Sequence, residues 1–367
     1  MRPTIKDVAK RAGVSATTVS MVLNDPDNSI SERTRKMVIR AVQELNYRPN
    51  RLAVSLVTKK TNIIGLVFPV DINSFQETFL NHIQEEASAR GYTIIFSTAN
   101  EDADRTILQL CDFTDRGVDG IILAQSSFKD PAGTDACLKA IAGLNTPIVL
   151  VDRVPEDCAF DMIKINDYRG GYDAIKYLLD LGHRKIGIIT GPMYINNCVN
   201  RLAGCRGALE DAGIPFYDAF VFEGAFDIPS GAAALPYLLG QNITAVFAFN
   251  DMTAYGVYKE ARKYNLSIPT DLSVIGFDDM FFSDIIYPPL TTVEFPFKKM
   301  AVAAVERLIL RINGAAQATG EGGRQGQGQG LRQEVAPGTG TGQGQSIGRE
   351  VMMFDPIIKV RGSTRRL

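Results

Sequence analysis

From residue 62 onward, short apolar runs alternate with segments of helix length. The runs are rich in β-branched residues and are not interrupted by polar residues at every second position. Such runs are typical of strands buried on both faces of a parallel sheet, because helical crossovers cover both faces. About ten strands exceed one comfortable open sheet, so the pattern predicts an α/β protein with two doubly wound subdomains. The clearest runs are residues 63–68, 93–96, 120–123, 148–151, 186–189, 245–249 and 273–277.

Polar and aromatic residues follow several of these predicted strands. Doubly wound folds bind ligands outside the carboxyl ends of their strands. Carboxylates, amides and guanidinium groups can pair with vicinal hydroxyls, and aromatic faces cover the apolar side of a sugar ring. A loop cap or turn explains any one of these residues equally well. Their coincidence favours a site for a polyhydroxylated ligand, built from residues 71–75, 125–128, Asp152 with Arg153, Asn250 with Asp251, and Asp278 with Asp279.

The first sixty residues follow a different pattern. Thr4 and Ser15 are suited to cap two short helices, and Gly13 between them can take a positive φ. Ser31 can cap a third helix with an inward face at Met37, Val38, Ala41, Val42 and Leu45. Two short helices joined by such a turn form a helix-turn-helix unit. Its second helix would present short side chains to a major groove, namely Ala16, Thr17, Thr18, Ser20 and Met21.

The charge distribution bears on what this unit binds. Residues 1–60 hold 12 Lys and Arg against 5 Asp and Glu, whereas the whole chain has a net charge of −2. A basic end on an acidic body indicates a polyanionic partner, although a solvated basic surface has the same composition. A three-helix protein-docking module remains the alternative, and the basic excess favours DNA.

Residues 46–60 connect the two parts. Asn46 to Pro49 ends the third helix, and Asn50 can cap a short segment, Arg51–Leu56. That segment is too short to be a stable helix by itself. It could fold on DNA, with a leucine wedged between base pairs of the minor groove, or it could be a plain linker.

This N-terminal series of residues resembles the headpiece of the LacI/GalR repressor family. The resemblance rests on Thr4-Ile5-Lys6-Asp7-Val8-Ala9, Ala12-Gly13-Val14-Ser15, Thr18-Val19-Ser20, Val22-Leu23-Asn24 and Asn46-Tyr47-Arg48-Pro49-Asn50. It implies that Ala16, Thr17 and Met21 read bases and that Leu56 is the hinge leucine. Met21 and Val54 stand where many family members carry basic or polar residues. The full set expected at DNA is Thr4, Ser15, Ala16, Thr17, Thr18, Ser20, Met21, Asn24, Tyr47, Asn50, Ala53 and Leu56.

The remainder resembles the periplasmic-binding-protein-like core of the same family. The matching strings include Val151-Asp152-Arg153, Gly182-His183-Arg184, Arg201-Leu202-Ala203-Gly204, Phe249-Asn250-Asp251, Gly276-Phe277-Asp278-Asp279 and Arg361-Gly362-Ser363-Thr364. The resemblance implies an effector cleft between the subdomains, a homodimer with a tetramer left open, and ligand-controlled closure that changes operator affinity. A sugar is the favoured effector, and a nucleobase is the alternative. The expected effector residues are Phe75, Phe128, Asp152, Arg153, Arg201, Phe226, Asn250, Asp278 and Phe297.

Residues 315–350 fit neither part. They contain 11 Gly and 7 Gln. With so few apolar side chains, the segment cannot bury enough surface to offset the entropy lost when it becomes ordered. We therefore expect a flexible insertion. The predicted organisation is a headpiece at 1–48, a hinge helix and linker at 49–60, and a core at 61–367 that carries this insertion.

Other function classes have weaker support. The sequence lacks a nucleophile elbow, a phosphate-binding loop and a zinc motif, so we expect no enzyme, cofactor or metal site. The five cysteines include no close pair, which favours free thiols. The first residues lack a secretory signal and no run is long enough to span a membrane, so the expected location is cytoplasmic. A sugar-scavenging protein would not need the headpiece, and an architectural DNA-bending protein would not need the polar cleft.

Overall fold

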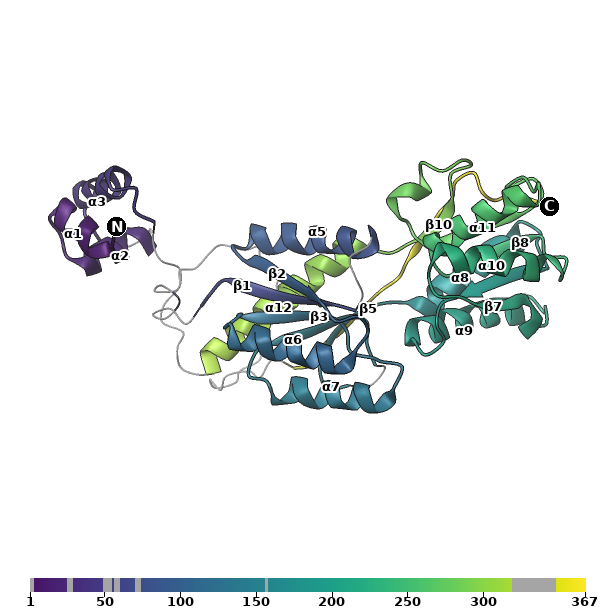
Figure 1. Ribbon diagram of the computed structural model, residues 1–367, viewed down its shortest axis with the longest axis horizontal. Helices are drawn as coiled ribbons and strands as arrows, with labels where there is room; N and C mark the ends of the chain where they lie inside the picture. The colour runs from purple at the N-terminus through teal and green to yellow at the C-terminus, as the bar shows by residue number, and fades with distance from the viewer. Residues whose placement is uncertain are drawn as a thin grey trace, which may run out of the picture. The chain divides into compact units, whose positions relative to one another are not determined.

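The computed structural model describes residues 3–24, 29–48, 55, 60–69, 74–155, 158–318 and 348–367 (Figure 1). The chain divides into two compact units, Met1–Thr61 and Asn62–Leu367. The sequence predicts a further division of the first unit into headpiece and hinge. Most of that hinge, including Asn50, Ala53 and Leu56, lies outside the described residues.

The first unit consists of α1 (Ile5–Ala12), α2 (Ala16–Asn24) and α3 (Glu32–Glu44). Thr4 precedes α1, and both its backbone N–H and its hydroxyl donate to the Asp7 carboxylate at 2.8 Å. Gly13 ends the helix with a φ of 66°. Ser15 and Ser31 begin the next two helices by accepting from the backbone N–H groups of Thr18 and Thr34, at 3.0 and 3.3 Å. All three predicted helix starts are therefore confirmed.

A small apolar core holds these helices together. Val8, Val19 and Val38 are fully buried, one from each helix. The sequence analysis also placed Met37 in this core, and that placement is wrong, because Met37 is 44% exposed. Each residue advances about 100° around a helix, so the neighbour of a fully buried residue turns away from the core.

The second unit contains two six-stranded sheets. The first has the order β11-β5-β4-β3-β1-β2 and is parallel throughout. The second has the order β12-β10-β9-β8-β6-β7 and is parallel except where β12 pairs antiparallel with β10. The strands of the first sheet are β1 (Ile63–Phe68), β2 (Thr93–Thr98), β3 (Gly120–Gln125), β4 (Ile148–Arg153), β5 (Asp161–Ile165) and β11 (Val351–Phe354). Those of the second are β6 (Ile186–Thr190), β7 (Val221–Glu223), β8 (Ala245–Ala248), β9 (Ser273–Asp278), β10 (Thr291–Glu294) and β12 (Ile357–Lys359).

Helices cover both faces of each sheet (Figure 1). The first sheet carries α5 (Ser74–Ala89), α6 (Ala103–Asp115), α7 (Pro131–Gly143) and α12 (Phe297–Ala318). The second carries α8 (Asp167–Asp180), α9 (Asn196–Asp211), α10 (Ile228–Leu239) and α11 (Asp251–Lys263), with the short 3-10 helices η1 (Asp218–Phe220) and η2 (Phe281–Ser283). Within β1, Leu66 joins the core cluster that contains residues of α5 and α12, and Val67 joins the one with residues of α6 and α7. Apolar residues at consecutive positions are thus buried on opposite faces.

The chain passes between the two sheets three times. β5 leads to α8, β10 leads to α12, and β11 leads to β12. As a result, residues distant in sequence share a subdomain. The final helix α12 continues to Ala318, four residues into the predicted insertion, and residues 319–347 lie outside the described residues.

Candidate effector cavity and DNA-binding interface

A cavity of about 790 Å³ lies where the strands of both sheets reach their carboxyl ends. From the first sheet it receives residues that end or follow β1, β2, β3 and β4, and from the second residues that end or follow β6, β7, β8 and β9. This is the position at which doubly wound folds bind ligands. The polar and charged lining residues are Gln76, Asn100, Glu101, Asp152, Arg153, Tyr194, Asn197, Arg201, Asp227, Asn250 and Asp278.

The structure brings most of the expected effector residues to this cavity. Seven line it: Phe75, Asp152, Arg153, Arg201, Phe226, Asn250 and Asp278. Phe128 and Phe297 do not, although the sequence analysis placed both there. Phe128 is 7% exposed and packs in the apolar core that includes residues of α7. Phe297 is 8% exposed and packs with its ring edge-on to Phe75, with centroids 5.0 Å apart, so it supports a lining residue from behind.

Arg201 is the central buried cation of the cavity. It comes from α9 and donates to the Asp167 carboxylate at 2.6 Å through Nη2 and also to the carbonyl of Phe249. Its guanidinium lies over the Phe277 ring, 3.3 Å from the centroid. Both charged partners are buried, at 5% exposure for Arg201 and 6% for Asp167. Burial raises the pKa of Asp167 to about 6, against the opposing effect of Arg201.

Asp152 and Asp278 supply two further carboxylates, one from each sheet. Asp152 accepts from the Asn197 amide at 2.9 Å. Both residues have positive φ, 65° for Asp152 and 111° for Asp278, which is uncommon for non-glycine residues. Burial raises the pKa of each, and that of Asp278 well above its usual range. Two carboxyl groups thus face one cavity, available to accept from ligand hydroxyl or amide groups.

Polar contacts also connect the two subdomains beside the cavity. Arg153 donates to Glu101 Oε1 at 2.5 Å, and the Tyr194 hydroxyl donates to Glu101 Oε2 at 2.7 Å. Burial and this hydrogen bond raise the pKa of Tyr194 to about 12. The guanidinium of Arg153 lies 5.8 Å from the centroid of the Phe226 ring. Glu101 and Arg153 belong to the first subdomain and Tyr194 and Phe226 to the second. The Tyr194–Glu101 hydrogen bond and the Arg153–Phe226 contact therefore bridge the cleft, whereas the Arg153–Glu101 pair lies within the first subdomain.

Six polar lining residues were not predicted from the sequence: Gln76, Asn100, Glu101, Tyr194, Asn197 and Asp227. Glu101 follows β2 closely, so the strand-end rule that selected Asp152 would have found it if applied to that strand. Tyr194 and Asn197 lie in the segment after β6 and at the start of α9. Nothing in the local sequence marks either residue, because their partners lie far away in the chain.

The first unit presents the helix-turn-helix surface. In α2, Thr17 and Met21 are exposed, and Ala16, Thr18 and Ser20 are partly exposed. Ser15 at the start of this helix is exposed as well. An exposed N-terminal end with short side chains is the part of a recognition helix that reaches base edges.

The other expected DNA-binding residues have different settings. Thr4 is exposed and held by Asp7, and Tyr47 is partly buried against the apolar core of the headpiece. Asn24 is the last residue of α2. The functions of the individual residues remain predictions.

Neither a metal-binding cluster nor a membrane-spanning helix is found among the described residues. Across these residues, no three His, Cys, Asp or Glu side chains are grouped so as to hold a metal ion. No described helix is both long and apolar enough to cross a membrane.

The fold and the two surfaces define the class of protein: a helix-turn-helix DNA-binding unit joined to a two-subdomain ligand-binding core. Comparison with known families agrees. Residues 4–50 match the model of bacterial regulatory proteins of the lacI family, and residues 175–321 match a periplasmic binding protein-like domain. The HTH-type transcriptional regulator DegA of Bacillus subtilis (strain 168) is 37% identical over 82% of this chain and 88% of its own length. The chain belongs to the LacI family of transcriptional regulators.

Other relatives and solved structures extend this result. The ribose operon repressor of Escherichia coli (strain K12) is 35% identical over 84% of this chain and 93% of its own. A lac repressor dimer bound to operator and the anti-inducer ONPF has a TM-score of 0.79 at 25% identity, with full coverage of both chains. The transcriptional regulator CelR in complex with cellobiose has a TM-score of 0.67 at 28% identity, over 99% of this chain and all of that one. A LacI family regulator from Enterococcus faecium with bound ribose has a TM-score of 0.66 at 26% identity, over 83% of this chain and 99% of that one.

Proposed function

We propose that this chain is a repressor that binds a near-palindromic operator as a homodimer, with an affinity set by a small polar effector in the cavity between its subdomains. In this proposal residues 1–48 form the DNA-binding headpiece, 49–60 the hinge and 61–367 the effector-binding core. A protein whose target is operator DNA acts in the cytoplasm, and the role requires no catalysis.

The charge arrangement of the cavity is the observation that carries the choice of effector. Both lining arginines are already paired, Arg201 with Asp167 and Arg153 with Glu101. The carboxyl groups of Asp152 and Asp278 remain to face a ligand. An anionic effector would find no unpaired arginine in the lining and would lie beside acidic groups, so the cavity favours an uncharged ligand rich in hydroxyl groups.

The lining aromatic residues support the same class of ligand. The Phe75 and Phe226 side chains contribute apolar surface beside the polar groups. A sugar can place its hydroxyls on carboxylates and its C–H face on a ring. Cellobiose and ribose, the ligands of two solved relatives, are both uncharged sugars. We therefore favour a sugar and keep a nucleobase, which could stack on the same rings, as the alternative.

Two measurements test the proposal on the full-length chain. The first is calorimetric titration with D-ribose, cellobiose, D-glucose, adenine and ribose 5-phosphate. We expect an uncharged sugar to bind, and ribose 5-phosphate to bind at least tenfold more weakly than ribose. The second is fluorescence anisotropy with a duplex selected from a random library, with and without the sugar that binds.

Ligand-controlled closure predicts that the sugar changes duplex affinity by about 5- to 150-fold, the range of a coupling free energy of about 1–3 kcal/mol. Verified sugar binding with unchanged duplex affinity would contradict the regulatory role. Sugar binding without any duplex binding would instead indicate a sugar-binding protein. Preference for the phosphorylated sugar would contradict the charge argument.

A further inference from the structure

The segment from Asp278 to Asp284 delivers two lining residues, Asp278 and Met280, to the cavity. It leaves β9 with two consecutive non-glycine residues at positive φ, 111° at Asp278 and 58° at Asp279. Such a backbone persists only where surrounding groups hold it in place. The backbone of Asp278 is held on one side by β10, where its carbonyl accepts from the N–H of Phe295 at 3.2 Å, and on the other side by whatever anchors this loop.

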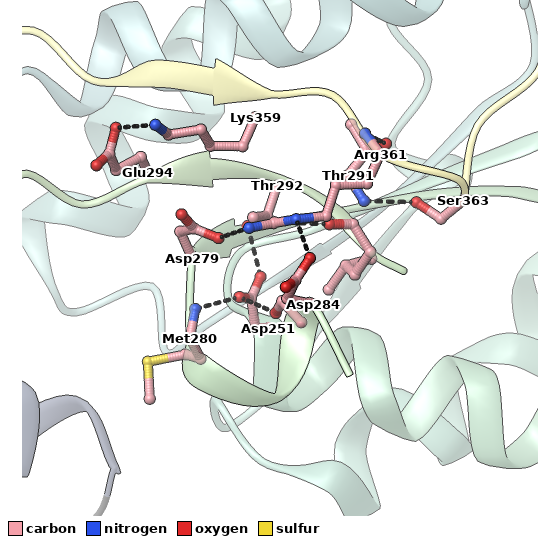
Figure 2. Close-up of polar contacts among 12 residues, drawn as sticks. Asp251, Asp279, Met280, Asp284, Thr291, Thr292, Glu294, Lys359, Arg361 and Ser363 are labelled. Atoms are coloured by element: carbon pink, nitrogen blue, oxygen red, sulfur yellow. Dashed lines mark hydrogen bonds and ion pairs between the residues drawn. The ribbon is translucent and has the colours of Figure 1, made fainter. Parts of the chain in front are cut away.

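The anchor is the carboxylate of Asp251, the first residue of α11. Its side chain is completely buried. Oδ2 accepts from the backbone N–H of Met280 at 2.8 Å and from the hydroxyl of Ser283, and Oδ1 accepts from the hydroxyl of Thr292 at 2.6 Å (Figure 2). One carboxylate thus connects the loop to α11 and to the adjacent strand β10.

The surrounding sequence makes room for this carboxylate. A side chain at Gly276 would place its Cβ 2.2 Å from Asp251 Oδ1, so β9 can pass here only without one. The Tyr255 hydroxyl also hydrogen-bonds with that of Ser283, at 2.7 Å. Asp251 directly follows Asn250, which lines the cavity and donates to the carbonyl of Phe226 at 2.9 Å. A cavity residue and the loop anchor are therefore neighbours in the chain.

Arg361 holds the outer side of the same loop. Its guanidinium pairs with Asp279 at 2.7 Å and with Asp284 at 3.4 Å, and it donates to the carbonyl of Leu290 at 3.0 Å (Figure 2). These contacts hold the backbone on either side of η2. The contact of Asp251 with the Met280 N–H lies closer to the cavity, since Met280 itself lines it.

We propose that Asp251 is a positioning residue for effector recognition: by holding Met280 and Ser283, it fixes the backbone that presents the Asp278 carboxyl group to the effector. This inference rests on the proposed function only in taking Asp278 as an effector contact. Asp251 itself does not line the cavity.

Three variants of the full-length chain separate positioning from general stability. Asp251→Ala leaves the Met280 N–H and two hydroxyls without their acceptor. Asp251→Asn keeps an amide oxygen for Met280 and Ser283 and turns its amide nitrogen to the Thr292 hydroxyl, which can accept. Val257→Ala is the matched control, because Val257 is fully buried on the same helix and packs in an apolar cluster that includes no residue of the 278–284 loop.

The first readout is hydrogen exchange and needs no ligand. We expect Asp251→Ala to speed exchange across residues 278–284, including the Met280 amide, at least tenfold, with little change across 273–277. Exchange in Asp251→Asn should stay within threefold of the wild-type rate. Val257→Ala should leave exchange in the loop unchanged when compared at an equal loss of melting temperature. Equal acceleration in the Ala variant and the control would overturn the proposal. If Asp251→Ala does not fold, Ser283→Ala, which removes one loop contact, is expected to give a smaller increase confined to the same residues.

The second readout is calorimetric titration with the panel sugar that the wild-type chain binds. Asp251→Ala should weaken binding at least tenfold, while Asp251→Asn and Val257→Ala should stay within threefold. Unchanged affinity in Asp251→Ala would overturn the positioning role. If no panel sugar binds the wild-type chain, the proposed function fails, and hydrogen exchange still decides whether Asp251 holds the loop.

Discussion

Replacing Arg201 with methionine tests the electrostatic structure of the cavity most directly. Methionine retains much of the length of arginine and can still pack on the Phe277 ring, but it cannot donate. The substitution leaves the Asp167 carboxyl group buried without its cation and the Phe249 carbonyl without its donor. Arg206, on the same helix but with a 54% exposed side chain, provides the matched control as Arg206→Met.

The expected loss has three parts. The pKa of Asp167 is about 6, so this group can take up a proton in the variant at a cost of about 1.4 kcal/mol at pH 7. The carbonyl of Phe249 left without a donor adds about 1–3 kcal/mol. Loss of the cation over the Phe277 ring adds about 1 kcal/mol. The total, about 3–5 kcal/mol, matches what removing one partner of a buried ion pair typically costs.

Scanning calorimetry at pH 7 and pH 5 checks this result. We expect a fall in melting temperature of about 6–20 °C for Arg201→Met at pH 7, and almost none for Arg206→Met. Burial raises the pKa of Asp167 above its unfolded value, so protonation stabilises the native state, and that contribution disappears as the pH rises through about 6. The deficit of the variant should therefore shrink by roughly 1 kcal/mol at pH 5. A melting temperature within about 2 °C of the wild type, or an equal deficit at both pH values, would refute the reasoning.

Four further predictions concern other parts of the chain. Leu56→Ala should weaken binding to a selected duplex far more than binding to a random one in a gel-shift titration; equal losses would contradict a minor-groove role. Tyr194→Phe removes the hydroxyl that bridges the cleft to Glu101 and should change the affinity for the panel sugar by about fivefold, with the fold retained, since one hydrogen bond contributes about 1 kcal/mol. Asp161→Asn should lose about 3 kcal/mol in urea denaturation at pH 7 and progressively less as the pH falls below the ordinary Asp pKa of 3.8. Although burial opposes it, hydrogen bonding to two arginines lowers the pKa of Asp161, so its stabilisation is present at neutral pH and lost as the pH falls through that lowered value. Replacing residues 319–347 with a short Gly-Ser linker should leave melting temperature and sugar affinity nearly unchanged, and a large loss of either would indicate a structural role.

The sequence predicted the two-sheet architecture because central strands of both sheets, such as β1, β3, β4, β6 and β8, are continuous apolar runs. It did not reveal how the chain divides between the sheets. β11 and β12 lie only a few residues apart yet belong to different sheets, and β11 alternates exposed and partly buried residues instead of forming an apolar run. Its place in the first sheet depends on pairing with β5, almost two hundred residues earlier in the chain. The local sequence of β11 does not identify this partner strand.

The residues of the candidate site were also predictable only in part. Asp152, Asn250 and Asp278 were predictable because they end or follow strong apolar strands, where position in the fold follows from position in the sequence. Phe128 also follows such a strand, but its ring turned to the apolar core, which any large aromatic side chain favours. Tyr194 contacts Glu101 across the cleft, and that contact joins residues from two subdomains. Whether a polar residue lies within reach of a distant partner is a property of the tertiary fold.

Backbone conformation gives an independent reason to regard this cavity as the functional site. Among the described residues, ten non-glycine residues have positive φ, and five of them line the cavity: Asn100, Glu101, Asp152, Phe226 and Asp278. The cavity has 24 lining residues, so this concentration is far above the share expected from its size. Glycine would fit each position at lower conformational cost, and Glu and Phe gain none of the local hydrogen bonding that eases this conformation for Asn and Asp. Stability alone would not favour these side chains at positive φ. Contact with a ligand at the carboxyl ends of the strands explains their presence there.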